Sequence, residues 1–224
     1  MIDDRNLYDR GYFADHYLTP NPKRDAAMHL ERERLRGLVT TGATVLDVGC
    51  GLGKFLSLFN PKHWDRFGID PSPVASKYAA ERGITMVEKI EWLGVETFDL
   101  VIYRGTLQHI WNPMDSLVNA TRILRPGGVL AILATPDTDS LVYQIWGELP
   151  ALERPRNCVL FGHRYLRNIL ERLGYQDIRI SHPYWSTPYA RPGSDIIKFM
   201  VSLVAGWRPF AFPGNMMEIT AFKK

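Results

Sequence analysis

The feature that most constrains the fold is an apolar run that ends in three alternating glycines within residues 45–55, VLDVGCGLGKF. The apolar residues up to Val48 are typical of a buried strand, and glycines permit a tight turn and a close approach of the backbone to a ligand. The spacing of Phe55, Leu56 and Phe59 predicts a helix directly after the turn. The segment therefore predicts a strand, a glycine loop and a helix, the unit from which ligand-binding α/β sheets are built.

The rest of the chain alternates between strand-like and helix-like segments. Apolar or alternating runs predict seven strands, at residues 43–48, 66–69, 84–87, 98–103, 129–134, 178–180 and 216–222. Strands separated by helices are typical of a doubly wound α/β fold with parallel pairing. The final run alternates apolar and polar residues, so we expect a mostly parallel seven-stranded sheet with a C-terminal antiparallel strand.

Composition excludes several function classes. The formal net charge of +3 is mild for a chain of 224 residues, and this disfavours a nucleic-acid partner. The basic residues of segment 23–36 alternate with acids, which predicts a solvated helix face. Cys50 and Cys158 have no metal-ligand spacing, so no metal site is expected. The acidic start and the lack of a long apolar run predict neither a signal peptide nor an integral membrane segment, and a cytoplasmic location is expected.

The spacing of the glycine loop indicates which ligand it holds. Dinucleotide sites use G-x-G-x-x-G, which leaves room for a pyrophosphate, whereas this loop reads G-x-G-x-G with Asp47 two residues before Gly49. A carboxylate there repels a pyrophosphate and suits a ligand that carries an ammonium and a sulfonium. Asp70, about 20 residues past the glycines, is placed to accept hydrogen bonds from a ribose diol. The alternative for Asp70 is that it only caps the helix that begins near Ser72.

Three motifs in order then resemble the class I S-adenosylmethionine-dependent methyltransferases, in particular the small-molecule branch of type 11 or 23. The glycine loop is similar to that family's first motif, residues 98–101 followed by 107–110 resemble its fourth-strand motif, and the run RILRPGGVL at 122–130 resembles its motif before strand five. The resemblance covers roughly residues 44–173 and implies S-adenosylmethionine as cofactor.

The resemblance also implies which residues contact that cofactor. Asp47 and the loop residues Gly49, Cys50, Gly51 and Gly53 would face its methionine part. Asp70 with Pro71 would face the ribose. The residues expected near the adenine are Lys89, Ile90 and Glu91. Lys89 stands where the family usually has an acid, so the sequence does not indicate which of these side chains faces the adenine.

The acceptor is expected beyond the fourth strand, because ligands of such sheets sit at the carboxyl ends of the strands. Tyr103 and Arg104 end that strand and are expected to contact the cofactor, and Arg104 has the alternative of pairing with a surface acid. His109 is the candidate catalytic base, with a packing role as the alternative. His163 and His182 are weaker candidates.

The chain is expected to form one domain, residues 1–224. It comprises an N-terminal helical cap (1–42), a cofactor-binding core (43–136), a lid insertion (137–162) and a C-terminal half with acceptor-side elements (163–224). Residues 195–207 are too apolar for a solvated helix. They are expected to pack on the sheet, or to form a homodimer contact, or lastly to touch a membrane surface.

These features predict an enzyme that methylates a small-molecule acceptor, foremost a hydroxyl of a sugar or secondary metabolite. N- or C-methylation of a quinone, a lipid-like compound or another metabolite is the alternative within the enzyme class. A cofactor-binding protein without catalysis is the alternative outside it. Residues 103–106 lack the Asn/Asp-Pro-Pro-aromatic motif, which disfavours amino-group methylation of a nucleobase.

Overall fold

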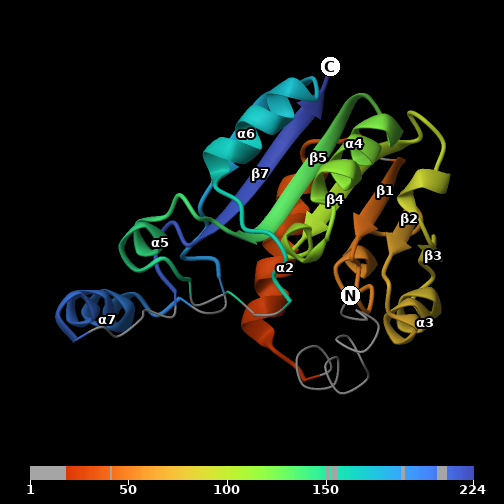
Figure 1. Ribbon diagram of the computed structural model, residues 1–224. Helices are drawn as coiled ribbons and strands as arrows, with labels where there is room; N and C mark the ends of the chain where they lie inside the picture. Colours follow the sequence, from red (N-terminus) through yellow and green to blue (C-terminus); the bar gives the residue numbers. More distant parts are fainter. Residues whose placement is uncertain (1–18, 41, 150–151, 153–155, 188–189, 206–210) are drawn as a thin grey trace.

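The computed structural model describes residues 19–40, 42–149, 152, 156–187, 190–205 and 211–224 (Figure 1). Seven strands form one sheet in the order β3-β2-β1-β4-β5-β7-β6. They are β1 (Ala43–Val48), β2 (Trp64–Ile69), β3 (Thr85–Met86), β4 (Phe98–Arg104), β5 (Leu124–Pro136), β6 (Tyr175–Ser181) and β7 (Met216–Lys223). Strand β7 runs antiparallel to both of its neighbours, β5 and β6, and the pairs among β1 to β5 are parallel. The predicted fold class and its reversed last strand are confirmed.

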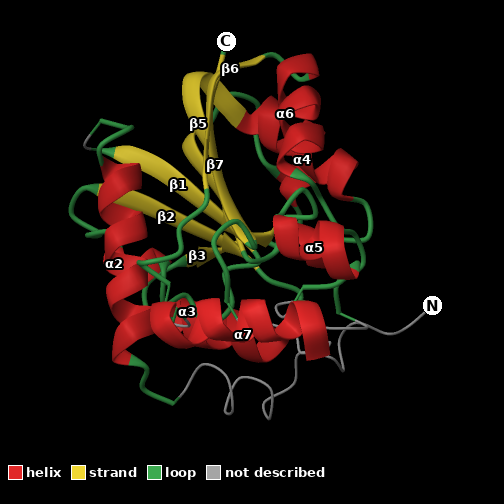
Figure 2. Ribbon diagram, turned by 90° about the vertical axis from the view of Figure 1, so that its left-hand side faces the viewer, coloured by secondary structure: helices red, strands yellow, loops and turns green. Residues whose placement is uncertain are grey.

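Helices cover both faces of the sheet (Figure 2). One face carries α2 (Pro22–Arg36) and α3 (Pro73–Glu81), and the other carries α4 (Pro113–Ile123) and α6 (His163–Arg172). The central strands β1, β4 and β5 are buried almost throughout, because both faces are covered. Two apolar clusters result, one on each side of the sheet. This layered core holds the carboxyl ends of β1, β2 and β4 at one edge.

The prediction of a helix directly after the glycine loop is wrong. Only a single 3-10 turn, η3 (Leu56–Leu58), forms between the loop and β2. The chain turns at Asn60, whose side chain accepts a hydrogen bond from the Lys62 N–H at 3.0 Å. Pro61 lacks an N–H and disfavours helical backbone at Asn60, so a helix cannot continue there. Phe55, Leu56 and Phe59 still fill the apolar cluster beside α2, although not as a helix face.

The prediction that segment 23–36 presents a solvated charged face is also wrong in part. Glu31 of α2 is buried and bonds Arg104 of β4, with Nε and Oε2 2.6 Å apart. Arg34 bonds the largely buried Glu218 of β7, also at 2.6 Å. The interleaved charges therefore attach α2 to the sheet by ion pairs, in addition to its apolar packing.

Two segments beyond the sheet edge differ from the compact core. Within residues 137–162 the chain forms the short helix α5 (Leu141–Trp146), and a bridge between Asp137 and Phe161 closes the segment's ends. Helix α7 (Pro192–Ala205) projects away from the layers (Figure 1) and contacts α5 through the rings of Phe199 and Trp146. The expected packing of α7 on the sheet is not what the structure has. Its large apolar side chains are exposed at Ile196, Ile197, Met200, Val201, Leu203 and Val204.

Candidate active site

The glycine loop is pinned to the end of β2 by its backbone. The N–H groups of Gly49 and Cys50 both donate to the carbonyl of Ile69, at 2.7 and 3.0 Å. Gly49 has φ +79°, and a Cβ there would lie 2.2 Å from the Thr106 side chain. No side chain fits at such a distance, so glycine is required at this position.

The loop also uses its remaining N–H groups internally. Gly51 donates to Asp70 Oδ2 at 2.9 Å, and Gly53 donates to the Cys50 carbonyl at 3.0 Å. A pyrophosphate cradle needs several free N–H groups that point at the ligand. Four of the loop's N–H groups already have partners, so the loop suits a ligand held by side chains rather than by phosphate contacts.

Asp70 joins the glycine loop to the start of α3. Its Oδ2 accepts from Gly51, and its Oδ1 accepts from the N–H of Ser72 at 2.9 Å. Burial raises the pKa of this carboxyl, while the two backbone N–H groups oppose that shift. The N-cap of α3 is Ser72, whose hydroxyl accepts from Ala75, so Asp70 is not itself the helix cap. Each oxygen keeps a second acceptor site, which is what a ribose diol requires.

Asp47 is the one loop-side carboxylate with an unused atom. It is 2% exposed, and its Oδ1 has no hydrogen-bond partner. Burial raises the pKa of Asp47 to about 7, and the Arg104 guanidinium opposes that shift. A buried acceptor without a partner is unfavourable unless a ligand supplies the donor. An ammonium group beside the glycine loop would supply both a donor and a counter-charge, so the site fits the methionine part of the expected cofactor.

Arg104 stands at the end of β4 within this charged group. Besides its ion pair with Glu31, its guanidinium lies over the Phe55 ring, 5.2 Å from the centroid. Arg104 therefore pairs with an acid, as the alternative predicted, but this acid, Glu31, is buried and not on the surface. A contact between Arg104 and the cofactor stays a prediction. In this arrangement the Arg104 guanidinium is a counter-charge for both Glu31 and Asp47.

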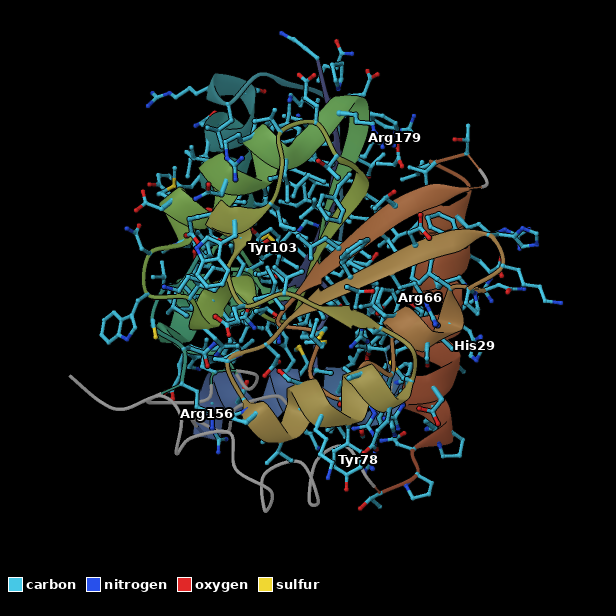
Figure 3. All side chains as sticks on the ribbon, turned by 90° about the vertical axis from the view of Figure 1, so that its right-hand side faces the viewer. His29, Arg66, Tyr78, Tyr103, Arg156 and Arg179 are labelled. Atoms are coloured by element: carbon cyan, nitrogen blue, oxygen red, sulfur yellow. The ribbon has the colours of Figure 1, made fainter. Side chains whose placement is uncertain are left out.

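Tyr103 points away from this group. Its side chain is fully buried, and its hydroxyl lies 2.8 Å from Ser116 Oγ of α4. Figure 3 shows Tyr103 in the interior of the molecule. Successive residues of a strand face opposite sides of the sheet, so Arg104 and Tyr103 cannot both face the same ligand. A contact of Tyr103 with the cofactor stays a prediction, and in this geometry it would come from the backbone rather than from the side chain.

The three residues expected near the adenine lie in different environments. Ile90 is buried in an apolar cluster, whereas Lys89, the N-cap of the 3-10 turn η4 (Ile90–Trp92), and Glu91 within that turn are exposed. The Lys89 ammonium lies over the Trp92 ring, 5.5 Å from its centroid. Cys50 is buried, and burial raises the pKa of its thiol, so it acts as a packing residue and not as a nucleophile. Pro71 is exposed next to Asp70.

His109 ends the turn η5 (Leu107–His109) that follows β4. Its Nδ1 lies 2.9 Å from the carbonyl oxygen of Arg156. A carbonyl only accepts, so Nδ1 carries the hydrogen, and Nε2 of the neutral ring has a lone pair that faces the Gln108 amide nitrogen at 3.4 Å. Figure 3 shows Arg156 at the lower edge of the molecule. The His109 ring is thus half-buried and oriented by the segment that follows α5.

His163 and His182 do not join His109. Both rings bond the buried carboxylate of Asp137 at the end of β5, each at 2.7 Å. The residues that sequence reasoning missed are Glu31, Thr106 and Asp137. No periodicity could have revealed them, because each acts on a partner 26 to 73 residues away.

A glycine loop after β1, an acid after β2 and a seven-stranded sheet with a reversed last strand together define the class I S-adenosylmethionine-dependent methyltransferases. A family model described as a methyltransferase domain matches residues 21–180. The chain therefore belongs to the methyltransferase domain family, and S-adenosylmethionine is its cofactor.

Known proteins that resemble the chain differ in acceptor. A tRNA U34 carboxymethyltransferase of Hahella chejuensis is 31% identical, over 62% of this chain and 46% of that protein. A ubiquinone biosynthesis O-methyltransferase of Roseobacter denitrificans is also 31% identical, over 39% of each. A Thermotoga maritima methyltransferase structure, described as a possible histamine N-methyltransferase, has a TM-score of 0.66 at 20% identity and covers 95% of this chain and 96% of that one. The chain spans less than half the length of these two curated relatives, and the structural likeness shows the fold alone.

Proposed function

We propose that this methyltransferase transfers a methyl group to a hydroxyl oxygen of a small polar acceptor, such as a sugar or another secondary metabolite. The observation that carries the proposal is His109. Its ring is oriented by the Arg156 carbonyl so that the Nε2 lone pair lies beyond the end of β4, where the Gln108 amide nitrogen contacts it at 3.4 Å and an acceptor hydroxyl would take that place. A hydroxyl acceptor must lose its proton as its oxygen attacks, and a positioned imidazole is the usual base for that step.

Buried polar side chains at the same edge support a polar acceptor. Gln108 is 5% exposed, and its Oε1 has no hydrogen-bond partner. Asn215, just before β7, is 4% exposed, and neither polar atom of its side chain has a partner. Buried amide atoms without a partner, Gln108 Oε1 and both polar atoms of Asn215, are costly in an apolar site and would be satisfied by a ligand with several hydroxyl groups.

The roles of the chain's own residues follow from these contacts. When bound, S-adenosylmethionine supplies an electrophilic methyl group on a sulfonium centre. Asp47 would hold its ammonium group, and Asp70 its ribose hydroxyls. The glycine loop lets the backbone approach closely, and His109 accepts the acceptor's proton. Most of the rate enhancement would come from holding the acceptor oxygen in line with the methyl carbon.

The test is transfer from methyl-labelled cofactor to matched acceptors that carry a hydroxyl, an amine or an activated carbon on one scaffold. We expect label on oxygen. Label on nitrogen or carbon would replace the proposal by the corresponding N- or C-methylation. Calorimetry with the cofactor runs beside it. Tight cofactor binding without transfer to any member of the panel would favour the binding protein without catalysis.

A further inference from the structure

Two imidazoles and one carboxylate converge beyond the end of β5. Asp137 directly follows that strand, His163 begins α6, and His182 follows β6. His163 Nδ1 and His182 Nε2 each lie 2.7 Å from the same oxygen, Asp137 Oδ2. The three atoms all lie within 4.8 Å of one another. Three segments that are distant in the sequence therefore bring one ligand-type atom each to within 4.8 Å of the others.

The carboxylate at the centre of this cluster is held rigidly. Asp137 is fully buried, and its Oδ1 accepts hydrogen bonds from the N–H groups of Asp139 and His163, at 2.9 and 3.1 Å. The pKa of Asp137 is lowered, because hydrogen bonds from His182, His163 and the backbone outweigh the effect of burial. Such support of one oxygen, with the other left toward the two rings, is the arrangement that orients metal ligands in proteins.

We propose that Asp137, His163 and His182 form a binding site for a divalent transition-metal ion such as zinc. Imidazole nitrogens with one carboxylate are ligands that zinc takes, with a fourth position left for water or another ligand. Magnesium and calcium prefer sites made of oxygen atoms alone, so the two nitrogens select against them. The side chains of His163 and His182 are 27% and 31% exposed, which leaves an entry path from solvent.

The alternative is a hydrogen-bonded cluster that takes no metal. The 2.7 Å contacts fit that state, in which each ring donates an N–H to Asp137. Zinc bonds of about 2.0–2.2 Å would set ligand atoms roughly 3.3 Å apart, so the rings need to move by less than about 1 Å. The metal would replace the two N–H donors and join β5, α6 and β6 through one ion. This proposal does not depend on the identity of the methyl acceptor.

The test is calorimetric titration of the whole chain with zinc chloride after treatment with a chelator. We expect one ion per chain, a rise of several degrees in Tm, and a preference for zinc over magnesium. The variants His163→Gln and His182→Gln should each bind zinc at least about 100-fold more weakly. His63→Gln is the matched control, because His63 is exposed and lies in the turn before β2. It should bind as the unaltered chain does.

A second measurement on the unaltered chain avoids any folding defect of the variants. Ring nitrogen signals of His163 and His182 should shift when zinc is added, while those of His29 and His63 stay in place. Absence of binding by the unaltered chain would overturn the proposal and leave a hydrogen-bonded cluster. Binding that survives in both variants, or ring shifts confined to other histidines, would overturn it as well.

Discussion

The loops after β1 and β2 and the segments after β5 and β6 lie at the same edge of the sheet but are built in different ways. The first pair is short and largely buried, and most of its described backbone N–H groups bond within these two loops or to the end of β2. The second pair is long, depends on side-chain contacts, and includes the exposed apolar face of α7. We therefore expect the cofactor to be bound by carboxylates held on short, hydrogen-bonded loops, and the acceptor to be bound by side chains of the longer segments.

The largest expected effect tests whether the glycine loop has room for a side chain at Gly49. Gly49 and Gly127 both have positive φ, +79° and +75°, but a Cβ meets nothing within 4 Å at Gly127 and meets Thr106 at 2.2 Å at Gly49. Gly127→Ala should lower the free energy of unfolding by about 1 kcal/mol, the backbone cost alone. Gly49→Ala should lower it by more than about 4 kcal/mol, or prevent folding. Urea unfolding measures both, and equal losses would contradict the steric argument.

The second effect tests the buried charge at Asp47. Its pKa of about 7 lies above the ordinary value of 3.8, so the folded state holds the proton more tightly than the unfolded chain. The resulting stability is complete below pH 3.8 and is lost as pH rises toward 7; a shift of this size corresponds to roughly 4 kcal/mol at most. Asp47→Asn should remove this pH dependence and stabilise the cofactor-free chain at pH 8.

The same substitution should weaken binding of S-adenosylmethionine by about 10- to 100-fold, because a charge-assisted hydrogen bond is lost. Urea unfolding at pH 5 and pH 8, with calorimetry at pH 8, measures the two effects on one variant. A variant that is destabilised at pH 8, or that keeps full cofactor affinity, would remove Asp47 from the site.

A smaller effect is expected at His109, on the acceptor side of the comparison. His109→Gln keeps a side chain that can donate to the Arg156 carbonyl but removes the base. The kcat should fall by about 100-fold or more, while the Kd of the cofactor changes by less than about threefold. Steady-state kinetics with calorimetry separate the two. Full activity in the variant would return His109 to a packing role.

The smallest effect on the active site is expected from α7. The homodimer contact through residues 195–207 stays a prediction, which the exposed Ile197 and Val204 make testable. Replacing both by Ser should abolish self-association in light scattering and leave cofactor affinity within about twofold. Val118→Ser, an exposed apolar position on α4, is the control. A chain that is monomeric at every concentration would end the homodimer prediction.

Sequence patterns were sufficient for the fold class and for the identity of the cofactor, because the strands and the glycine loop are specified by local residues. Alternating apolar runs predict the sheet, and the spacing of Asp47, the glycines and Asp70 follows from loop geometry that a few consecutive residues specify. The η3 turn was missed because Asn60 and Pro61 override the apolar periodicity of Phe55 to Phe59. The pairing of Glu31 with Arg104, and the meeting of Asp137 with two histidines, depend on chain topology, which residue spacing does not encode.

The buried carboxylate of Asp47 would couple cofactor binding to the stability of the fold. Ionisation of the buried Asp47 carboxyl near neutral pH destabilises the folded chain. A bound ammonium group would supply a counter-charge and so stabilise the folded state. The fraction of chains open to proteases would then rise when the methyl donor is scarce and fall when it is abundant.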